Sequence, residues 1–497
     1  MTRNVLSRSH RPLALAITLA LAASGVQAST ITVNSSDDSA MSTFCNLRNA
    51  IASINAAAVQ PNCMGTTTGT FGTSDTIVFA PSVANSTISM TQGEFAITAP
   101  LVITGSGQKL DAHAGYYRVM SSTQDLSLSN ITLSGGHPNA PGGGLYLNAA
   151  TSSTVTLSNV TLSNNAAPTG GGLYSKNAVN LTVRNSLISN NKCSAGAGGM
   201  LIRDGAATIT TSRITGNTSL GDTGGIRFGG ETATVDRTTI EGNSVTCSGN
   251  YCSAGVYVAG GQVTIGNSTI SGNSADGATG SDSFVTGGVY VFTSAATIFN
   301  TTISGNSASG ADLLAGAISE SNYAGTYGLT LTNTTVSGNS ATTSSASPAL
   351  VNGGVIVGAY YGGNTNSANT IVAGNTATIG TNAAAASDVA PGSTAPTLTF
   401  QFSLLGAALS TTFSGSNNVF NDTPGLGPLK SNGGPTKTRA LLAGSPAINA
   451  GSNALALDVN FNALSTDQTG GARIAATTVD IGAFEFPGDH IFGDGFE

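Results

Sequence analysis

Tryptophan is absent from this 497-residue chain, and only 8% of its residues are charged. Beyond the N-terminal segment there is no apolar run of about 18 residues, so we expect no transmembrane span. Low charge can indicate disorder, but 40% of the residues are hydrophobic and 65 are glycine. With the regular spacing described below, that composition indicates a packed β core. The formal net charge of −7 argues against nucleic acid as a partner.

The first 28 residues have the pattern of a secretory signal peptide. Three arginines precede an apolar stretch over 13–23, and small residues at 26–28 form a cleavage site. We therefore expect an exported protein, and disulfide bonds are compatible with that environment.

A seven-residue phrase, Asn267-Ser268-Thr269-Ile270-Ser271-Gly272-Asn273, recurs between residues 130 and 375 at intervals of 26 to 36 residues. Repeats of that period are typical of solenoids. Each repeat contains three short strand patterns and no helical pattern. The sequence thus predicts an all-β fold, a right-handed single-stranded parallel β-helix of the pectin-lyase-like type with three strands per coil, over 75–375.

Stacked coils place like residues in columns about 4.8 Å apart. We expect Ile240, Ile270 and Ile303 to point inward, and flanking residues such as Thr269 and Ser271 to face water. The asparagine that closes each phrase tolerates left-handed backbone and can pass amide hydrogen bonds from coil to coil. This structural ladder comprises Asn165, Asn191, Asn217, Asn243, Asn273, Asn306, Asn339 and Asn375. A second asparagine column opens the phrase and is interrupted by Thr211 and Arg237.

Five cysteines allow two disulfides. Cys45 and Cys63 flank one N-terminal segment, and Cys247 and Cys252 lie in one long loop, so we expect each of these two pairs to be bonded. Cys193 begins the same Cys-Ser-Ala-Gly phrase as Cys252 and competes as its partner, which leaves open which thiol is unpaired.

Residues 29–74 form the expected N-terminal cap, with a strand at 30–33 and a helical face that includes Leu47, Ile51 and Ile54. The stretch 45–51, Cys-Asn-Leu-Arg-Asn-Ala-Ile, resembles the CSLREA motif of exported bacterial β-helix proteins, with asparagine in place of the motif's serine and glutamate.

After the last regular repeat we expect a linker over 376–398, because the segment is rich in alanine, threonine, serine and glycine. Gly- and Pro-rich phrases within 399–486 resemble the choice-of-anchor Q region, which implies a cap at the C-terminal end of the helix. The tail 487–497 resembles terminal tags of secreted Gram-negative proteins, and the resemblance implies an extracellular or outer-membrane-surface location.

The repeats also resemble those of polymorphic outer-membrane proteins and autotransporter passengers. About 120 residues follow the last repeat, and they lack the alternating strands of a translocator barrel.

One candidate binding feature is a column of tyrosines beside the inward strand positions, namely Tyr146, Tyr174, Tyr257 and Tyr290, with Arg227 interrupting it. Exposed aromatic faces on successive coils could stack on sugar rings. The alternative is that these side chains pack beneath the variable loops.

Weaker catalytic candidates come from a charge-rich stretch and are Arg203, Asp204, Arg227, Glu231 and Asp236. Lyases and glycosidases need carboxylates and a proton-transfer group, but charges on outward positions are usually solvated ion pairs. No ligand spacing indicates a metal or another cofactor.

We therefore expect a monomeric adhesin-like protein that binds a carbohydrate or cell-surface ligand through its variable loops and tyrosine column. The main alternative is a carbohydrate-active enzyme, either a polysaccharide lyase or a glycosidase. A passive structural protein of the envelope or matrix is the third hypothesis, because the fold alone does not decide function.

Overall fold

The computed structural model describes residues 28–487 except 151, 248, 250, 278–283, 311, 323–326, 360–361, 393–395 and 407–412. The predicted signal peptide and C-terminal tail, apart from Ala28 and Pro487, lie outside the described residues. No helix within the described part is long and apolar enough to cross a membrane.

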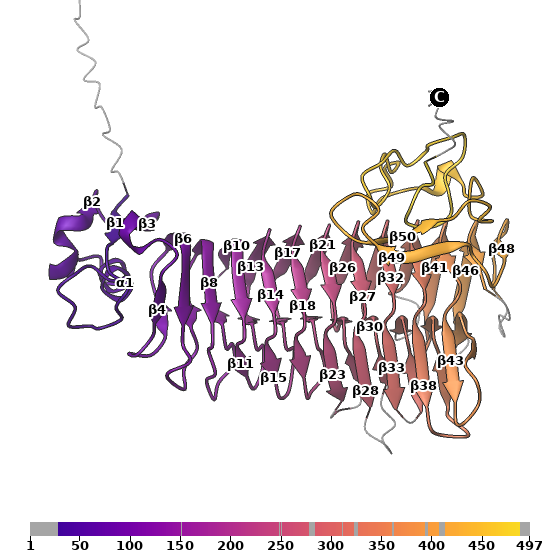
Figure 1. The fold of residues 1–497 in the computed structure, drawn as a ribbon, viewed down its shortest axis with the longest axis horizontal. Coiled ribbons are helices and arrows are strands. Elements are labelled where there is room, and N and C mark those ends of the chain that lie inside the picture. The colour runs from indigo at the N-terminus through magenta and orange to yellow at the C-terminus, as the bar shows by residue number, and fades with distance from the viewer. Residues whose placement is uncertain are drawn as a thin grey trace, which may run out of the picture.

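The described coils form a right-handed parallel β-helix, as the repeat predicts (Figure 1). One sheet is bent at the opening position of the phrase, and three long strands run through both of its limbs: β6 (Leu101–Asp111), β8 (Leu126–Ser134) and β10 (Ser153–Ser163). On later coils the bend separates two strands. The first limb contains β3 (Asp75–Phe79), β13 (Val179–Arg184), β17 (Ala206–Thr210), β21 (Thr232–Asp236), β26 (Gln262–Gly266), β31 (Ala295–Phe299), β36 (Leu329–Thr332), β41 (Asn364–Ala368) and β46 (Thr397–Gln401). The second limb contains β4 (Thr87–Ser89), β14 (Leu187–Ser189), β18 (Arg213–Thr215), β22 (Thr239–Glu241), β27 (Thr269–Ser271), β32 (Thr302–Ser304), β37 (Thr335–Ser337), β42 (Ile371–Val372), β47 (Leu404–Leu405) and β48 (Val419–Phe420).

Two further sheets complete the coils, and their strands are parallel except for β44, which pairs antiparallel with β43. The β5–β45 sheet contains β5 (Phe95–Ile97), β7 (Met120–Ser122), β9 (Leu145–Asn148), β12 (Leu173–Lys176), β16 (Met200–Ile202), β20 (Ile226–Phe228), β25 (Val256–Val258), β30 (Val289–Phe292), β35 (Ile318–Ser321), β40 (Val355–Val357) and β45 (Val389–Pro391). The sheet that begins at β11 (Ala166–Ala167) contains β15 (Lys192–Cys193), β19 (Thr218–Ser219), β23 (Ser244–Cys247), β28 (Ser274–Gly277), β33 (Ser307–Gly310), β38 (Ser340–Thr343), β43 (Thr376–Ile379) and β44 (Ala385–Ala386).

The core of the helix is the predicted aliphatic column. Ile240, Ile270 and Ile303 are partners in register on β22, β27 and β32, and each is fully buried. Branched side chains suit these positions because they pack well against the neighbours above and below. The column confirms the fold class.

The closing asparagines are buried and hydrogen-bonded from coil to coil. Asn217, for example, donates its backbone N–H and its Nδ2–H to Oδ1 of Asn243 at 3.0 and 2.9 Å, and also donates Nδ2–H to the Ile188 carbonyl at 3.0 Å. The left-handed backbone, however, lies at other positions of the phrase. It occurs at the opening residue, such as Asn185 with φ of 50°, and at the residue before the closing asparagine, such as Gly216 with φ of 65°.

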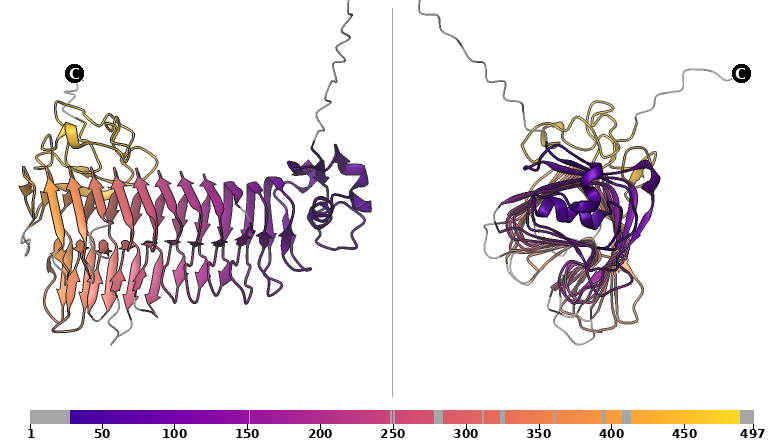
Figure 2. Two further views of the ribbon diagram at one scale, coloured as in Figure 1. Left: turned by 180° about the vertical axis from the view of Figure 1, so that it is seen from behind. Right: turned by 90° about the vertical axis from the view of Figure 1, so that its left-hand side faces the viewer.

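The N-terminal cap covers the first coil. Helix α1 (Leu47–Asn55) lies across the open end of the solenoid (Figure 2), and β1 (Thr30–Val33) pairs with β3 and with β2 (Thr67–Thr68). Arg48 anchors the helix by an ion pair with Asp38 at 2.8 Å and a hydrogen bond to the Gly93 carbonyl at 2.8 Å. Short 3-10 turns lie at Pro61–Thr66 (η1) and Pro81–Val83 (η2).

The cysteines pair as Cys45–Cys63 and Cys247–Cys252, and Cys193 is a buried free thiol. The sequence left open whether Cys193 or Cys247 bonds Cys252, and the structure assigns Cys247.

The solenoid continues through the segment expected to be a linker. β43 pairs in register with β38, β45 pairs with β40, and β46 pairs with β41. The strand patterns here are short and rich in threonine and alanine, so their composition resembles that of a loop. The expected boundary between the linker and the C-terminal cap at residue 399 falls within the last coils, because β46 and β47 belong to the bent sheet.

Residues 424–486, here called the C-terminal region, fold back along the outer face of the second limb, over β27, β32, β37 and β42 (Figures 1 and 2). The region contains the hairpin of β49 (Leu426–Lys430) and β50 (Thr438–Leu441) and the short η3 (Asn453–Leu455). It therefore covers a side of the solenoid, whereas the sequence predicted a cap over its end.

This docking buries positions that the repeat pattern predicted to face water. Thr269 and Thr302 are completely buried, and Ser271 is 5% exposed. Thr302 donates its hydroxyl to Oε1 of Gln468 at 2.6 Å, and Gln468 donates Nε2–H to the Ser268 carbonyl at 2.8 Å. The expectation was wrong at these coils because a segment more than 160 residues away supplies partners for the threonines.

Candidate binding groove

An open groove follows the bend of the bent sheet on the coils that the C-terminal region leaves uncovered. One cavity of 460 Å³ is lined by residues that include Gly105, Asn130 and Thr132. It shares Asn159 and Thr161 with a second cavity of 490 Å³. The groove therefore spans the coils from β6 to β22, a length of roughly 24 Å at the usual strand spacing.

The second cavity ends against the C-terminal region, which contributes Pro435 to its lining. A third cavity of 540 Å³ continues beside it, shares Arg213, and is bounded by Leu429 and Lys437 of the C-terminal region. The groove is thus built by two parts of the chain, the solenoid and the segment that folds back onto it.

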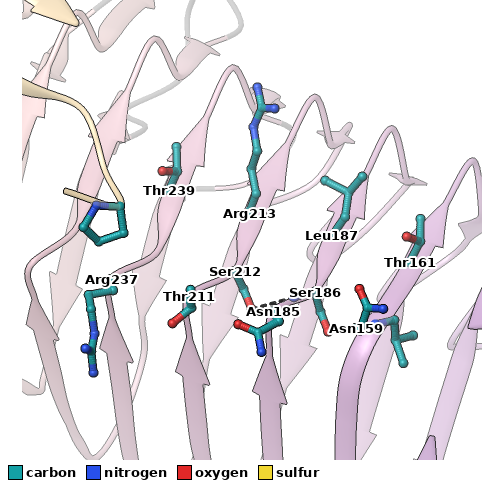
Figure 3. A pocket seen from close by; sticks show the side chains of 12 residues that line it. Asn159, Thr161, Asn185, Ser186, Leu187, Thr211, Ser212, Arg213, Arg237 and Thr239 are labelled. Carbon is teal, nitrogen blue, oxygen red and sulfur yellow. Dashed lines mark hydrogen bonds between the residues drawn. The ribbon is translucent and has the colours of Figure 1, made fainter. Parts of the chain in front are cut away.

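The floor of the groove is made of left-handed residues and hydroxyl groups (Figure 3). Asn159 and Asn185 have φ of 56° and 50°, a conformation that asparagine accepts more readily than most residues. Their side chains are exposed, and Asn159 donates Nδ2–H to Oδ1 of Asn130 at 2.6 Å. The neighbouring Ser186 donates its backbone N–H to Oγ of Ser212 at 3.1 Å, so the serines bond to one another beneath the exposed amides.

Cations gather where the groove meets the C-terminal region. Arg213 donates Nε–H to Oε1 of Glu241 at 2.8 Å, and Lys437 donates Nζ–H to Oε2 of the same carboxylate at 3.0 Å. Burial alone raises the pKa of Glu241, but the hydrogen bonds from Lys437 and Arg213 outweigh it, and the pKa lies below its ordinary value. Glu241 therefore stays ionised and holds two cations at the groove.

Arg237 occupies the opening position of its coil and forms an ion pair with Asp236 at 2.8 Å. Figure 3 shows Arg213 and Arg237 leaving the bend in opposite directions, so they flank the groove from its two limbs.

The tyrosine column is in the predicted register, but it does not present an open aromatic face. Tyr146 is opposite Tyr174, and Tyr257 is opposite Tyr290. Tyr174, Tyr257 and Tyr290 are only 6%, 5% and 0% exposed. Burial raises the pKa of Tyr257 to about 12. These side chains are part of the packing, which corresponds to the alternative that the sequence left open.

The cover over Tyr290 comes from the variable loops. Their strands β24 (Tyr251–Ser253), β29 (Phe284–Thr286), β34 (Leu313–Ala315) and β39 (Leu350–Asn352) form a small parallel sheet of their own. Tyr251 and Phe284 stack on Tyr290 with ring centroids 6.0 and 6.3 Å away. A sequence signal for this sheet exists: each of these loops has a large apolar residue four positions before the second residue of the small-residue pair.

The charge-rich residues do not form one cluster. Arg227 is opposite Leu201 on β16 and not beside Arg203. It pairs with Asp222 and lies over the Tyr257 ring at 4.9 Å. Arg203, Asp204 and Glu231 are exposed where the β5–β45 sheet turns into the first limb. Asp236 lies at the bend of the bent sheet, bonded to Arg237 and to Nδ2 of Asn267.

Two buried glutamates among the described residues were not predicted from the sequence. Glu320 occupies the column of Val291 and Val357, which points into the core, and it is fully buried. Within the C-terminal region, the fully buried Arg473 pairs with Glu485 at 3.2 Å and donates to the Asp480 and Gly482 carbonyls. No group of three or more potential metal ligands occurs among the described residues.

These observations define the class of the protein as a right-handed parallel β-helix with a docked C-terminal region. A family model described as a right-handed beta helix region matches residues 119–317. The solved structure titled "Crystal structure of pectate lyase Pel9A" is similar with 15% sequence identity and a TM-score of 0.42, and the match covers 93% of this chain and 97% of that chain. No curated protein matches the sequence.

Proposed function

We propose that this protein is an exported, adhesin-type binding protein that holds a linear surface partner in the groove along its bent sheet. The observation that supports the proposal is the length of the groove, which crosses successive coils and repeats exposed amide and hydroxyl groups along the way. A row of similar polar groups suits a polymer better than a compact metabolite, because each coil offers another set of hydrogen bonds.

The groove replaces the tyrosine column as the proposed binding surface. Ligand contact at Tyr174 or Tyr290 would require the loops above them to move, whereas Asn159, Asn185 and Arg213 are already exposed. Pre-formed sites need less reorganisation on binding.

The test compares two glutamate substitutions that differ only in location. Thr161→Glu places a longer, negatively charged side chain in the groove, whereas Thr208→Glu places one at an exposed position of the first limb, outside the groove lining. Both variants are measured on arrays of glycans and peptides and on intact bacterial and host cell surfaces. Binding that is lost in Thr161→Glu and kept in Thr208→Glu supports the proposal, and equal binding by both variants contradicts it.

The rival hypothesis of a carbohydrate-active enzyme has its own readout. Release of reducing ends or unsaturated sugar products from a polysaccharide panel would replace the binding proposal by a catalytic one. Export to the surface of a Gram-negative bacterium is part of the proposal, and its test is to fractionate cells into periplasm, outer membrane and medium.

A further inference from the structure

The bend of the bent sheet continues beneath the C-terminal region, where polypeptide occupies it. On the β41 coil, Asn369 donates Nδ2–H to the Ser452 carbonyl at 2.9 Å and accepts the Ser452 backbone N–H on Oδ1 at 2.7 Å. This paired contact satisfies a donor and an acceptor of the main chain with one amide side chain. Asn369 therefore binds peptide groups whatever side chain they carry.

Other covered coils make related contacts. Asn300 donates Nδ2–H to the Thr466 carbonyl at 2.8 Å, and the Asn267 carbonyl accepts the Thr436 hydroxyl at 2.9 Å. The chemistry at Asn369 thus recurs at Asn300, whereas Nδ2 of Asn333 on the coil between them has no hydrogen-bond partner among the described residues.

The uncovered coils carry the same groups at the same positions. Asn130 and Asn159 open their phrases as Asn300 does, and each is followed two residues later by a threonine. Asn130, Asn159 and Asn185 are exposed and share the left-handed backbone of Asn300 and Asn369. In the open groove these amides face solvent, whereas Asn300 and Asn369 on the covered coils bind main chain.

Charge selects among polypeptides. Three cations, Arg213, Arg237 and Lys437, and one anion, Glu241, line the three cavities. Asp236 pairs with Arg237 beside this lining, which leaves an excess of one positive charge along the groove. The chain as a whole has a net charge of −7, so this cationic lining differs from the overall balance. A partner with acidic side chains complements it.

We propose that the open groove, from Asn130 to Arg237, binds an extended acidic segment of a polypeptide partner. Asparagine side chains hold its peptide groups, and Arg213, Arg237 and Lys437 hold its carboxylates. The inference rests on the proposed binding function and names the chemical class of its partner.

The experiment uses the full exported chain and three fluorescent probes. They are a twelve-residue peptide of alternating aspartate and threonine, the same peptide with lysine in place of aspartate, and an oligo-uronate of comparable length. Fluorescence anisotropy gives the dissociation constants at low and at physiological salt. We expect the acidic peptide to bind best, and its affinity to fall with salt.

The groove variant is Asn159→Gly combined with Asn185→Gly. Glycine adopts positive φ freely, so the substitutions remove the amides without straining the backbone. The matched control is Asn177→Gly, since Asn177 is also exposed and left-handed, with φ of 65°, but lies outside the groove. We expect the groove variant, which lacks the hydrogen bonds from Asn159 and Asn185, to bind the acidic peptide about tenfold more weakly. The control should bind it as the natural chain does.

The outcomes separate this inference from the proposed function. If the acidic peptide fails to bind, or binds the groove variant and the control equally, the inference is overturned. If the oligo-uronate binds in a groove-dependent manner and the peptide does not, a glycan-binding function stands and the polypeptide partner is rejected. Binding of the acidic peptide that Arg213→Gln also weakens supports the inference.

Discussion

Asn375 donates both its backbone N–H and its Nδ2–H to Oδ1 of Asp388, at 2.9 and 2.8 Å. A carboxyl group therefore ends the buried amide ladder in the position that the next asparagine would occupy. Burial raises the pKa of Asp388 despite the two bonds from Asn375. Its other oxygen, Oδ2, is buried without a hydrogen-bond partner among the described residues.

The end of the ladder can be tested with two substitutions at this position. Asp388→Ala leaves the donors of Asn375 without an acceptor, so we expect a loss of about 2 kcal/mol in the free energy of unfolding at low pH, where Asp388 is neutral. The loss should be smaller at pH 8, where the natural chain keeps a buried charge. Asp388→Asn keeps an acceptor and removes the charge, so we expect it to be more stable than the natural chain at pH 8. Urea unfolding followed by circular dichroism measures both, and a destabilised Asp388→Asn at pH 8 would contradict the account.

Glu320 predicts a decline in stability with rising pH. Burial raises its pKa from 4.5 to about 7, so the folded chain keeps a proton that the unfolded chain releases between these values. Stability from this group is complete below pH 4.5 and is lost as the pH rises to about 7, with a total of roughly 3 kcal/mol.

Glu320→Gln should remove this component of the pH dependence. Glu485, whose pKa burial also raises to about 7, keeps its own component in that variant. Unfolding curves at pH 4.5, 6 and 8 provide the measurement, and an unchanged slope between these pH values in Glu320→Gln would refute the role of Glu320.

Thr211 occupies a left-handed position with φ of 49°, where most other coils have asparagine. A β-branched residue is strained there, so Thr211→Asn should stabilise the protein by about 1 kcal/mol. The control is Thr208→Asn, at an extended position of the same coil, where no gain is expected. Equal midpoints of urea unfolding for the two variants would show that backbone strain at residue 211 is negligible.

Gln468 connects the C-terminal region to the second limb through Thr302 and the Ser268 carbonyl. Gln468→Ala leaves buried polar groups unpaired, and we expect docking to weaken by about 2 kcal/mol. Limited proteolysis should then cleave within 424–486 faster while the solenoid stays intact. Gln262→Ala, at an exposed position of β26, serves as the control, and equal cleavage rates in both variants would exclude this role.

The solenoid could be predicted from the sequence because every repeat contains the same phrase with the same apolar positions. Ile240, Ile270 and Ile303 share one place in one phrase, and local pattern alone fixes their inward direction. The same reasoning failed for Thr269 and Thr302, since the residues that cover them, such as Gln468, belong to a part of the chain without the repeat. The tyrosine column shows the same limit: its register followed from the phrase, but its burial depends on Tyr251 and Phe284 in loops of irregular length.

The groove was not predicted for a related reason. Asn159, Asn185 and Arg213 look like ordinary repeat positions in the sequence, and they become distinctive only because the C-terminal region covers equivalent residues elsewhere. The repeat pattern shows what the coils have in common. The groove, however, is open only on those coils that the non-repeating C-terminal region does not cover.

Helix α1 and the C-terminal region each pack against their own group of coils, and the coils between them contact only their neighbours. Inserting or deleting one 26-residue unit among these middle coils would lengthen or shorten the groove by about 4.8 Å without disturbing the contacts at either end. The length of partner that the groove can hold would therefore change in steps of one coil.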